Sequence, residues 1–308
     1  MSGELLAYRP WRGTFRPPGW SVWPIARLAL LMIFRRKLFW ALYALALFIF
    51  FLYFFGQYML FWAESMMDQG SIPFFGRNVS PRQLTQPLRQ GALKLNGQGE
   101  MYLNFFWYQG YSLMMVLALA GSILVGNDIR HGSLPFYLSK PLTPSHYLAG
   151  KCLAVTVFVN MVTTLPALAL FVQFGVLDES DYFTEQPHLI LGIVGYGLIL
   201  SVVLSLVLVA LAVGLRKTVP MIMAWTTLFF FFRRLADALV IRLNYDPRWR
   251  LIDLWNDLFV VGSACMDTRT LTYGAQPEVW EAGLVLAAVS LLCLTYVVRR
   301  IRAVEVIS

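Results

Sequence analysis

The stretch of sequence that decides the fold is NDIRHGSLPFYLSKPLTPSHYLAGK, residues 127–151. It is polar, it contains prolines within short pieces that look helical, and it separates two long apolar runs at residues 104–126 and 152–176. An α-helix needs about 20 apolar residues to cross a bilayer. The stretch is therefore predicted to be a compact loop between two membrane spans, with a form suited to docking against a partner.

The composition of the whole chain is that of a membrane protein. Hydrophobic residues make up 58% of the 308 residues and charged residues only 14%, whereas a soluble domain is roughly a quarter charged. The formal charge of +8 comes from basic residues that flank apolar runs, which is a pattern of membrane topology and not of nucleic-acid binding. The three cysteines do not suggest a disulfide framework.

The apolar runs predict an all-α integral membrane protein. A cytoplasmic arm at residues 1–24 is followed by one transmembrane domain at residues 25–308, and residues 63–103 and 242–277 are predicted to be polar loops. The second loop contains an amphipathic piece, LIDLWNDLFVVG. The six predicted transmembrane helices are residues 38–62, 104–126, 152–176, 189–215, 219–241 and 279–298.

Two segments allow alternatives. Residues 25–37 are too short to span and end in three cations, so we expect a helix that lies in the membrane interface, the alternative being the first turns of the first span. Residues 219–232 provide about 14 apolar residues, or roughly 21 Å of helix, against a core of ~30 Å. Either this helix continues through Arg233 and Arg234, or it breaks there and residues 233–241 form a re-entrant helix near the outer surface, which we favour slightly.

The distribution of basic residues predicts the orientation. With both termini inside, the cytoplasmic segments hold 15 Lys and Arg residues and the outer loops hold eight, with Arg233 and Arg234 unassigned. The positive-inside rule therefore places both termini, and residues 127–151, in the cytoplasm of a multi-pass protein of the plasma (inner) membrane.

Several catalytic and metal-binding signatures are absent from the sequence. There is no phosphate-binding loop of the form G-x-x-x-x-G-K-[ST], no Cys/His spacing typical of zinc and no G-x-S-x-G elbow. We expect no enzyme activity and no cofactor in this chain. Carboxylates are almost absent from the predicted spans, which argues against a proton-driven carrier. Asp237 is expected to pair with Arg233 or Arg234, and Asn160 to form a hydrogen bond between helices.

Prolines organise residues 127–151 into two pieces. Ser133 can cap a short helix whose first turn contains Pro135, the Lys140–Pro141 step forces an extended exit, and Thr143 with Pro144 starts a second helix. That second helix is expected to run through Tyr147 and Lys151 into the third span. The first piece is either a rigid helix that transmits a push to the spans or a compact turn at the lipid headgroups. Its apolar side consists of Leu134, Phe136, Tyr137 and Leu138.

Residues 127–151 resemble the cytoplasmic segment of ABC-2 type transporter permeases. In that family an acidic residue, a small Gly-Ser/Thr pair, an apolar run, a proline-rich turn and a Tyr-Leu-x-Gly-Lys ending recur. The six predicted spans, the basic helix before the first and the RRIRAVEVIS tail are similar too, but the first outer loop is somewhat long. The matching residues are Asp128, Gly132, Ser133, Leu134, Leu138, Pro141, Tyr147, Leu148, Gly150 and Lys151.

The resemblance implies the membrane subunit of an ABC exporter. Such a permease pairs with a second copy or a paralogue, and separate ATPase (nucleotide-binding) subunits hold ATP and magnesium. The alternative from another class is a membrane anchor or scaffold that recruits partners without transport. The residues that the resemblance assigns to ATPase coupling are Asp128, Arg130, His131, Gly132, Ser133, Leu134, Phe136, Tyr137, Leu138, Pro141 and Tyr147.

Overall fold

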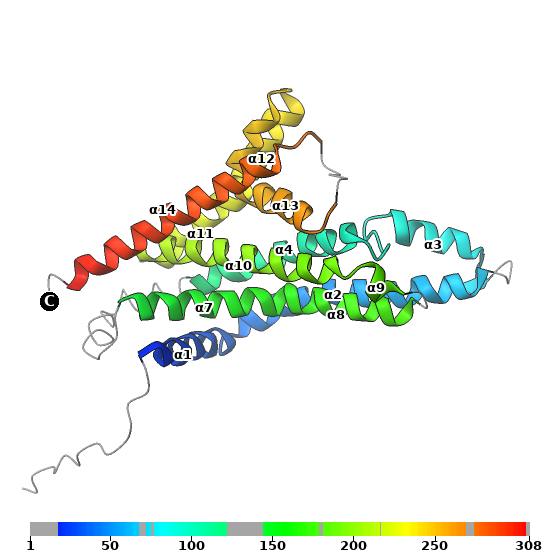
Figure 1. Cartoon of the computed structure of the whole chain (residues 1–308), viewed down its shortest axis with the longest axis horizontal. Coiled ribbons are helices and arrows are strands. Elements are labelled where there is room, and N and C mark those ends of the chain that lie inside the picture. The colour runs from blue at the N-terminus through cyan, green and yellow to red at the C-terminus, as the bar shows by residue number, and fades with distance from the viewer. Residues whose placement is uncertain are drawn as a thin grey trace, which may run out of the picture.

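The structure, a computed structural model, describes residues 18–67, 72–74, 77–121, 144–178, 181–215, 217–268 and 274–305. Figure 1 shows a bundle of long helices from which a second group of helices, α11 to α14, diverges. Among the described residues, five helices are long and apolar enough to cross a membrane, which agrees with a helical multi-pass membrane protein. They are Lys37–Ser65, Ser145–Leu177, His188–Leu215, Thr218–Arg242 and Val279–Arg300.

The described chain begins with two separate helices. After a 3₁₀ turn, η1 (Pro18–Ser21), α1 runs over Val22–Phe34 and α2 over Lys37–Ser65. The break falls at Arg36, whose backbone is extended. The predicted short helix before the first span is thus confirmed as a separate element, and the alternative that it forms the first turns of that span is wrong. Its place in the membrane interface remains a prediction.

Residues 63–103 contain more structure than the predicted polar loop. A hairpin of β1 (Ile72–Phe74) and β2 (Arg77–Val79) is followed by α3 (Pro81–Gln90). The prolines that suggested turns include one that begins a helix, because the first turn does not require its N–H. The Gln83 side chain accepts a hydrogen bond from the Ser80 N–H at 3.3 Å, as in a capping box.

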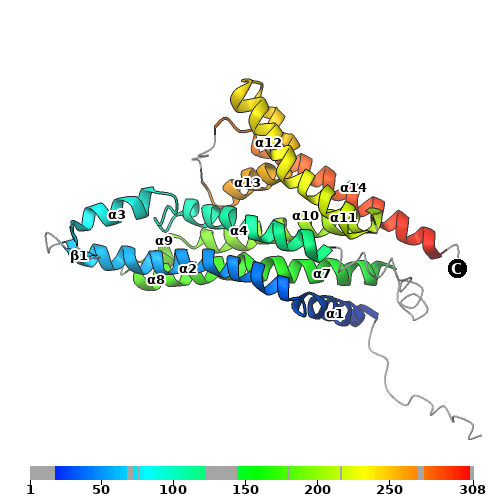
Figure 2. The ribbon, with the colours of Figure 1, turned by 180° about the vertical axis from the view of Figure 1, so that it is seen from behind.

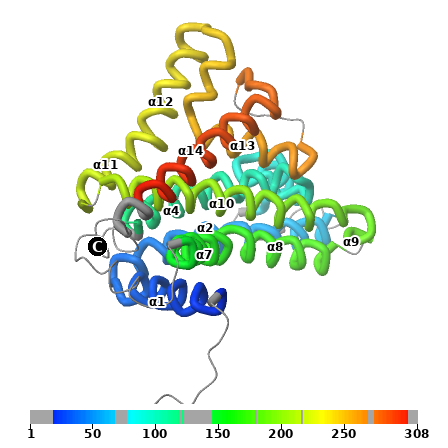
Figure 3. Tube along the Cα trace, turned by 60° about the vertical axis from the view of Figure 1, so that its left-hand side comes forward, coloured from blue at the N-terminus to red at the C-terminus, as the bar shows by residue number. Residues whose placement is uncertain are grey.

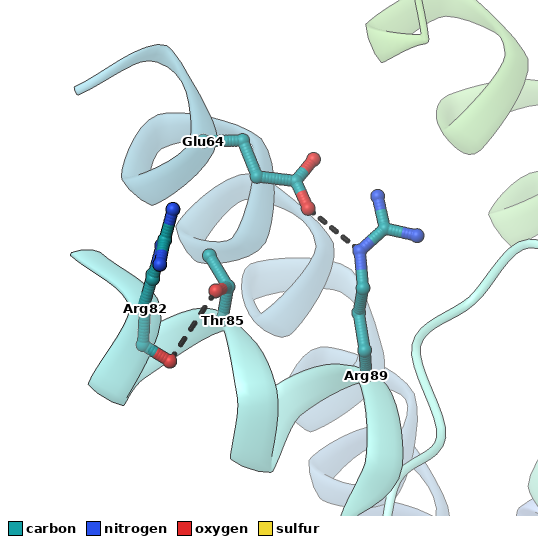
Figure 4. Close-up of polar contacts among 4 residues, drawn as sticks. All are labelled: Glu64, Arg82, Thr85 and Arg89. Atoms are coloured by element: carbon teal, nitrogen blue, oxygen red, sulfur yellow. Dashed lines mark hydrogen bonds and ion pairs between the residues drawn. The ribbon is translucent and has the colours of Figure 1, made fainter. Parts of the chain in front are cut away.

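Helix α3 is tied to the end of α2 by a charged contact (Figure 4). Arg89 Nε donates to Glu64 Oε1 at 2.6 Å, and this hydrogen bond raises the pKa of Arg89. Within α3, the Thr85 hydroxyl donates to the Arg82 carbonyl at 3.5 Å. Because both members of the Arg89–Glu64 pair are partly exposed, the pair fixes the position of α3 more than it stabilises the fold.

Helix α4 (Gly99–Gly121) includes most of the predicted second span, but it begins five residues earlier. It is not among the five apolar helices, since it contains polar residues such as Gln109 and Ser112, both buried. It packs against α2, α10, α11 and α13. A helix surrounded by protein in this way can hold polar groups that a lipid-facing helix would not tolerate.

The third predicted span is a nearly continuous pair of helices, α7 (Pro144–Val162) and α8 (Thr164–Leu177). Helix α7 begins at Pro144, which confirms that the helix after residues 127–143 runs directly into the span. Pro166 explains the break at Thr163, because a proline clashes with the preceding turn and provides no N–H. The short helix α9 (Tyr182–Glu185) leads into α10 (His188–Leu215), which matches the predicted fourth span.

The fifth span continues past its two arginines. Helix α11 (Thr218–Thr226), the π-helical segment η4 (Thr227–Phe231), α12 (Phe232–Asp237) and the π-helical segment η5 (Ala238–Arg242) follow one another without a gap. The favoured break at Arg233, with a re-entrant helix over residues 233–241, is therefore wrong. The chain turns only at residues 243–246, where Asn244 has a positive φ of 52°.

The segment that turns back into the bundle lies further along the chain. The 3₁₀ helix η6 (Pro247–Ile252) and α13 (Leu254–Cys265) descend from the turn, and α14 (Val279–Glu305) follows (Figure 2). Helix α13 packs against α4, α10 and α14 and is buried over most of its length. The predicted amphipathic piece at residues 251–262 forms the end of η6 and most of α13, and it lies within the bundle and not in a polar loop, because tertiary contacts cover its polar side as well.

One end of the bundle gathers the segments expected in the cytoplasm. Figures 1 and 3 show α1, the start of α7, the junction of α10 with α11 and the last turns of α14 at the same end. Helices α3 and α9 lie at the opposite end. The described segments that the count of cations assigns to one side of the membrane therefore lie at one end of the bundle.

Candidate functional site

The predicted coupling residues fall mainly outside the described structure. Ten of the eleven, from Asp128 to Pro141, lie at residues 122–143, which the structure does not describe. Tyr147, the eleventh, is in the first turns of α7 and is 2% exposed. A side chain buried to this extent can hold the segment in place, but it offers no surface to a docking partner.

The helix that leaves residues 127–143 is tightly packed where it enters the bundle. A Cβ atom at Gly150 would lie 2.7 Å from Ile25 Cβ and 3.1 Å from the Val22 carbonyl oxygen. Only glycine therefore allows α7 to approach α1 this closely. One turn from Tyr147, Lys151 is 2% exposed, and its ammonium lies 5.5 Å from the centre of the Tyr147 ring. The start of α7 is thus a rigid, glycine-dependent junction with α1.

The break between α7 and α8 is stabilised by polar side chains. Asn160 donates to the Thr156 carbonyl at 2.8 Å and accepts from the Thr164 hydroxyl at 2.7 Å. The predicted hydrogen bond of Asn160 between helices is thus present, and it joins α7 to α8 within the third predicted span. Other side chains do bond between spans: Gln109 of α4 donates to the Val162 carbonyl at 2.8 Å, and Gln173 of α8 donates to the Phe54 carbonyl of α2 at 2.8 Å.

A second cluster of charged residues lies where α12, η6 and α13 meet. The guanidinium of Arg233 is 4.3 Å from the centre of the Trp107 ring and 5.2 Å from that of Tyr111, both on α4. Asp237 lies 3.6 Å from Arg250, so its predicted pairing with Arg233 or Arg234 was wrong. The two aromatic rings stabilise the Arg233 cation, and the Asp253 carboxyl is close enough for the charge of Arg233 to lower its pKa. This environment lets the fifth span continue through Arg233.

Two carboxylates on α13 enter the bundle. Asp253 caps the helix by accepting from the Trp255 N–H at 3.0 Å, and burial raises its pKa to about 6. Asp257, one turn later, is 0% exposed, and neither of its oxygens has a hydrogen-bond partner among the described residues. Burial, with the charge of Asp253, raises the pKa of Asp257 to about 8. A carboxyl in this position can gain or lose a proton near neutral pH.

Sequence reasoning missed these carboxylates because residues 251–262 were assigned to a polar loop. The signal was present in the spacing, since Asp253 and Asp257 are four residues apart in an apolar segment and share one helix face. Polar contacts hold η6 and α13 against α14 and the residues just before it. Asn256 Nδ2 donates to Gln276 Oε1 at 2.9 Å, and Arg248 pairs with Glu281 at 2.8 Å.

The described residues contain no group of three His, Cys, Asp or Glu side chains that could hold a metal ion. Cys152, Cys265 and Cys293 are free thiols. The two arrangements with functional potential are therefore the packed start of α7 and the carboxyl pair of α13. Comparison of the chain with protein-family models and with curated proteins gave no match.

Proposed function

We propose that this chain is the membrane subunit of an ATP-driven exporter of the ABC-2 type. A separate ATPase contacts residues 127–151 on the cytoplasmic side, and its nucleotide-driven closure pushes the spans apart or together. The chain acts with a second permease copy or a paralogue, crosses the plasma membrane six times with α4 as the second span, and has both termini in the cytoplasm.

One observation supports this proposal most directly: residues 122–143 are followed at once by a helix that is locked into the bundle. Helix α7 starts at Pro144, and its Gly150 is in contact with Ile25 of α1. A force that reaches the start of α7 is therefore passed to α1 through the close contact at Gly150. Such a connection is what coupling between an ATPase and membrane spans requires.

The buried position of α4 is consistent with six crossings. Its 23 residues make a helix of about 34 Å, enough for a ~30 Å core. Its polar side chains are sheltered by α2, α10, α11 and α13.

The test is ATP hydrolysis by the complex purified from the native membrane in lipid nanodiscs. We expect an ATPase subunit with a phosphate-binding loop to be present, and Leu134→Asp and Gly132→Asp to reduce hydrolysis at least tenfold. Leu243→Asp is the matched control, because Leu243 is exposed in the turn after η5, at the end of the fifth span, away from the start of α7. Hydrolysis at the wild-type rate in both coupling variants, or purification without any ATPase, contradicts the proposal.

A second candidate function, an ATP-independent carrier driven by protons, is favoured by one observation. Asp257 is fully buried without a hydrogen-bond partner in the described part of the chain, and ionisable residues inside a membrane bundle commonly belong to proton pathways. Proton movement into liposomes that contain the purified chain alone, abolished by Asp257→Asn but not by Asp246→Asn in the exposed turn, would support this candidate. No proton movement by the wild-type chain excludes it.

A further inference from the structure

A cavity of about 770 Å³ lies between three of the apolar spans. It is bounded by α10, by the helix that α11 and α12 form, and by α14, and one end is closed by Leu251 and Ile252 of η6 with Leu254 of α13. Its size is in the upper part of the range for sites that bind small molecules. The three bounding helices are all long and apolar enough to cross a bilayer, so the cavity lies where lipid chains are the solvent.

The lining of this cavity is almost entirely hydrocarbon. On α10 it extends from Val207 to Leu215, and on α14 from Val285 to Tyr296. The α14 stretch corresponds to about 16 Å along the helix axis at 1.5 Å per residue. The polar side-chain groups in the lining are the Cys293 thiol and the Tyr296 hydroxyl, both on α14. The cavity is therefore a long apolar groove that suits a hydrocarbon chain.

The open end of the groove is basic. A Cβ atom at Gly214 would lie 3.0 Å from the Tyr296 hydroxyl, so α10 and α14 meet closely there. Lys217 follows α10 within three residues of Gly214, and Arg299 and Arg300 follow Tyr296 within one turn of α14. All three cations are exposed, and none has an ion-pair partner among the described residues.

We propose that this groove binds one anionic membrane phospholipid, with an acyl chain between α10 and α14 and the phosphate held by Lys217, Arg299 and Arg300. The proposal concerns a lipid that the protein retains and does not depend on the transport function. Basic clusters between membrane helices attract anionic headgroups, each cation contributing about 1 kcal/mol, or about fivefold in affinity. Each buried methylene group of the chain contributes further.

Charge favours a lipid over a second copy of the chain as the occupant. A symmetric dimer brings the same patch of both copies together, so a dimer through this groove would set Lys217, Arg299 and Arg300 against their own counterparts. Like charges that face one another without compensation oppose association. A phosphate supplies the missing negative charge, and its acyl chain matches the apolar lining.

The test is native mass spectrometry of the full chain with palmitoyl-oleoyl phosphatidylglycerol or palmitoyl-oleoyl phosphatidylcholine. We expect one phosphatidylglycerol to remain bound to the wild type and to bind at least tenfold more tightly than phosphatidylcholine. The triple variant Lys217→Gln/Arg299→Gln/Arg300→Gln should lose that preference. The matched triple control, Arg35→Gln/Arg82→Gln/Arg242→Gln, neutralises three exposed arginines away from the groove and should keep it.

Filling the groove tests the place of the acyl chain. Val289→Trp should reduce binding of both lipids at least tenfold, whereas Leu191→Trp, on α10 at a position that is 77% exposed, should not. Phosphatidylglycerol with a photoreactive acyl chain should label Cys293 or Tyr296 in the wild-type protein, which keeps the test valid if Val289→Trp does not fold. Equal binding of the two lipids, labelling elsewhere, or a dimer that Val289→Trp dissociates with lipid binding intact would each overturn the proposal.

Discussion

Gln109 of α4 donates a hydrogen bond from its side-chain Nε2 to the carbonyl oxygen of Val162 in α7, over a distance of 2.8 Å. In a regular helix that carbonyl would accept from the N–H of residue 166, but residue 166 is proline. The amide of another span thus satisfies a backbone acceptor that the proline leaves open. Gln109 also donates to the Ala46 carbonyl of α2 at 3.2 Å, so one side chain links three elements.

Replacing Gln109 with leucine should destabilise the protein by about 1–2 kcal/mol, because the buried Val162 carbonyl then has no donor. The measurement is thermal unfolding in detergent. In a Pro166→Ala background the backbone N–H of residue 166 is restored, and the same Gln109→Leu change should cost less. An equal cost in both backgrounds would show that the effect comes from packing or from Ala46 and not from Val162.

Replacing Gly150 with alanine should weaken the contact between α1 and α7 by about 1–3 kcal/mol, since the added Cβ would lie 2.7 Å from Ile25 Cβ. Gly195→Ala is the matched control, because a Cβ at Gly195 of α10 would meet no atom within 4 Å. The control should be neutral or stabilising by up to about 1 kcal/mol, as expected for alanine in a helix. Equal melting temperatures for the two variants would contradict the close approach of α1 and α7.

Removing Asp237 and removing Arg250, which form an ion pair, should destabilise the protein by different amounts. The Arg250 side chain is 4% exposed and that of Asp237 is 36% exposed. Asp237→Leu leaves a buried cation without its partner and should cost about 3–5 kcal/mol. Arg250→Met keeps an apolar stem and leaves a carboxylate that reaches water, so its cost should be smaller.

A double-mutant cycle on this pair gives the control. The double variant should be more stable than the sum of the two single changes predicts, because the buried cation is absent. Strict additivity, or a greater loss for Arg250→Met than for Asp237→Leu, would contradict this description of the pair.

The stability of the protein should fall as the pH rises from about 4 to about 8, and Asp257 should account for much of the fall. Burial raises the pKa of Asp257 from 3.8 to about 8, so the folded protein binds the proton more tightly than the unfolded chain. The contribution of the Asp257 proton to the free energy of unfolding is fully present below pH 4. As the pH rises towards 8, that contribution falls by about 1.4 kcal/mol per pH unit.

Thermal unfolding of the wild type and of Asp257→Asn across this pH range measures that contribution. Because the asparagine side chain cannot lose a proton, the stability of the variant relative to that of the wild type should increase with pH. Asp246→Asn, in the exposed turn before η6, should follow the wild type. A constant difference between wild type and Asp257→Asn from pH 4 to pH 8 would show that Asp257 is not the group that titrates.

The predicted positions of the long helices were close to those in the structure, because length and apolarity are local properties of the sequence. The helix break before Lys37 and the helix start at Pro144 were also predictable, since charge and proline act within one or two turns. The start of α3 at Pro81 follows the same rule, but the proline was read as a turn. Residues 128–141, with all but one of the predicted coupling residues, lie outside the described residues, and their role stays a prediction.

The amino-acid sequence by itself determined that this is a helical protein with apolar helices of membrane-spanning length, and where those helices lie along the chain. Only the tertiary structure decided which buried polar side chains have interaction partners and which residues those partners are. Gln109 meets a carbonyl 53 residues away, and Arg233 stacks on Trp107. Helix α13 brings Asp257 into the bundle, where its oxygens have no hydrogen-bond partner among the described residues. Apolar length is enough to place a helix in a bilayer, whereas the partner of a buried polar group depends on contacts between distant segments that no local pattern specifies.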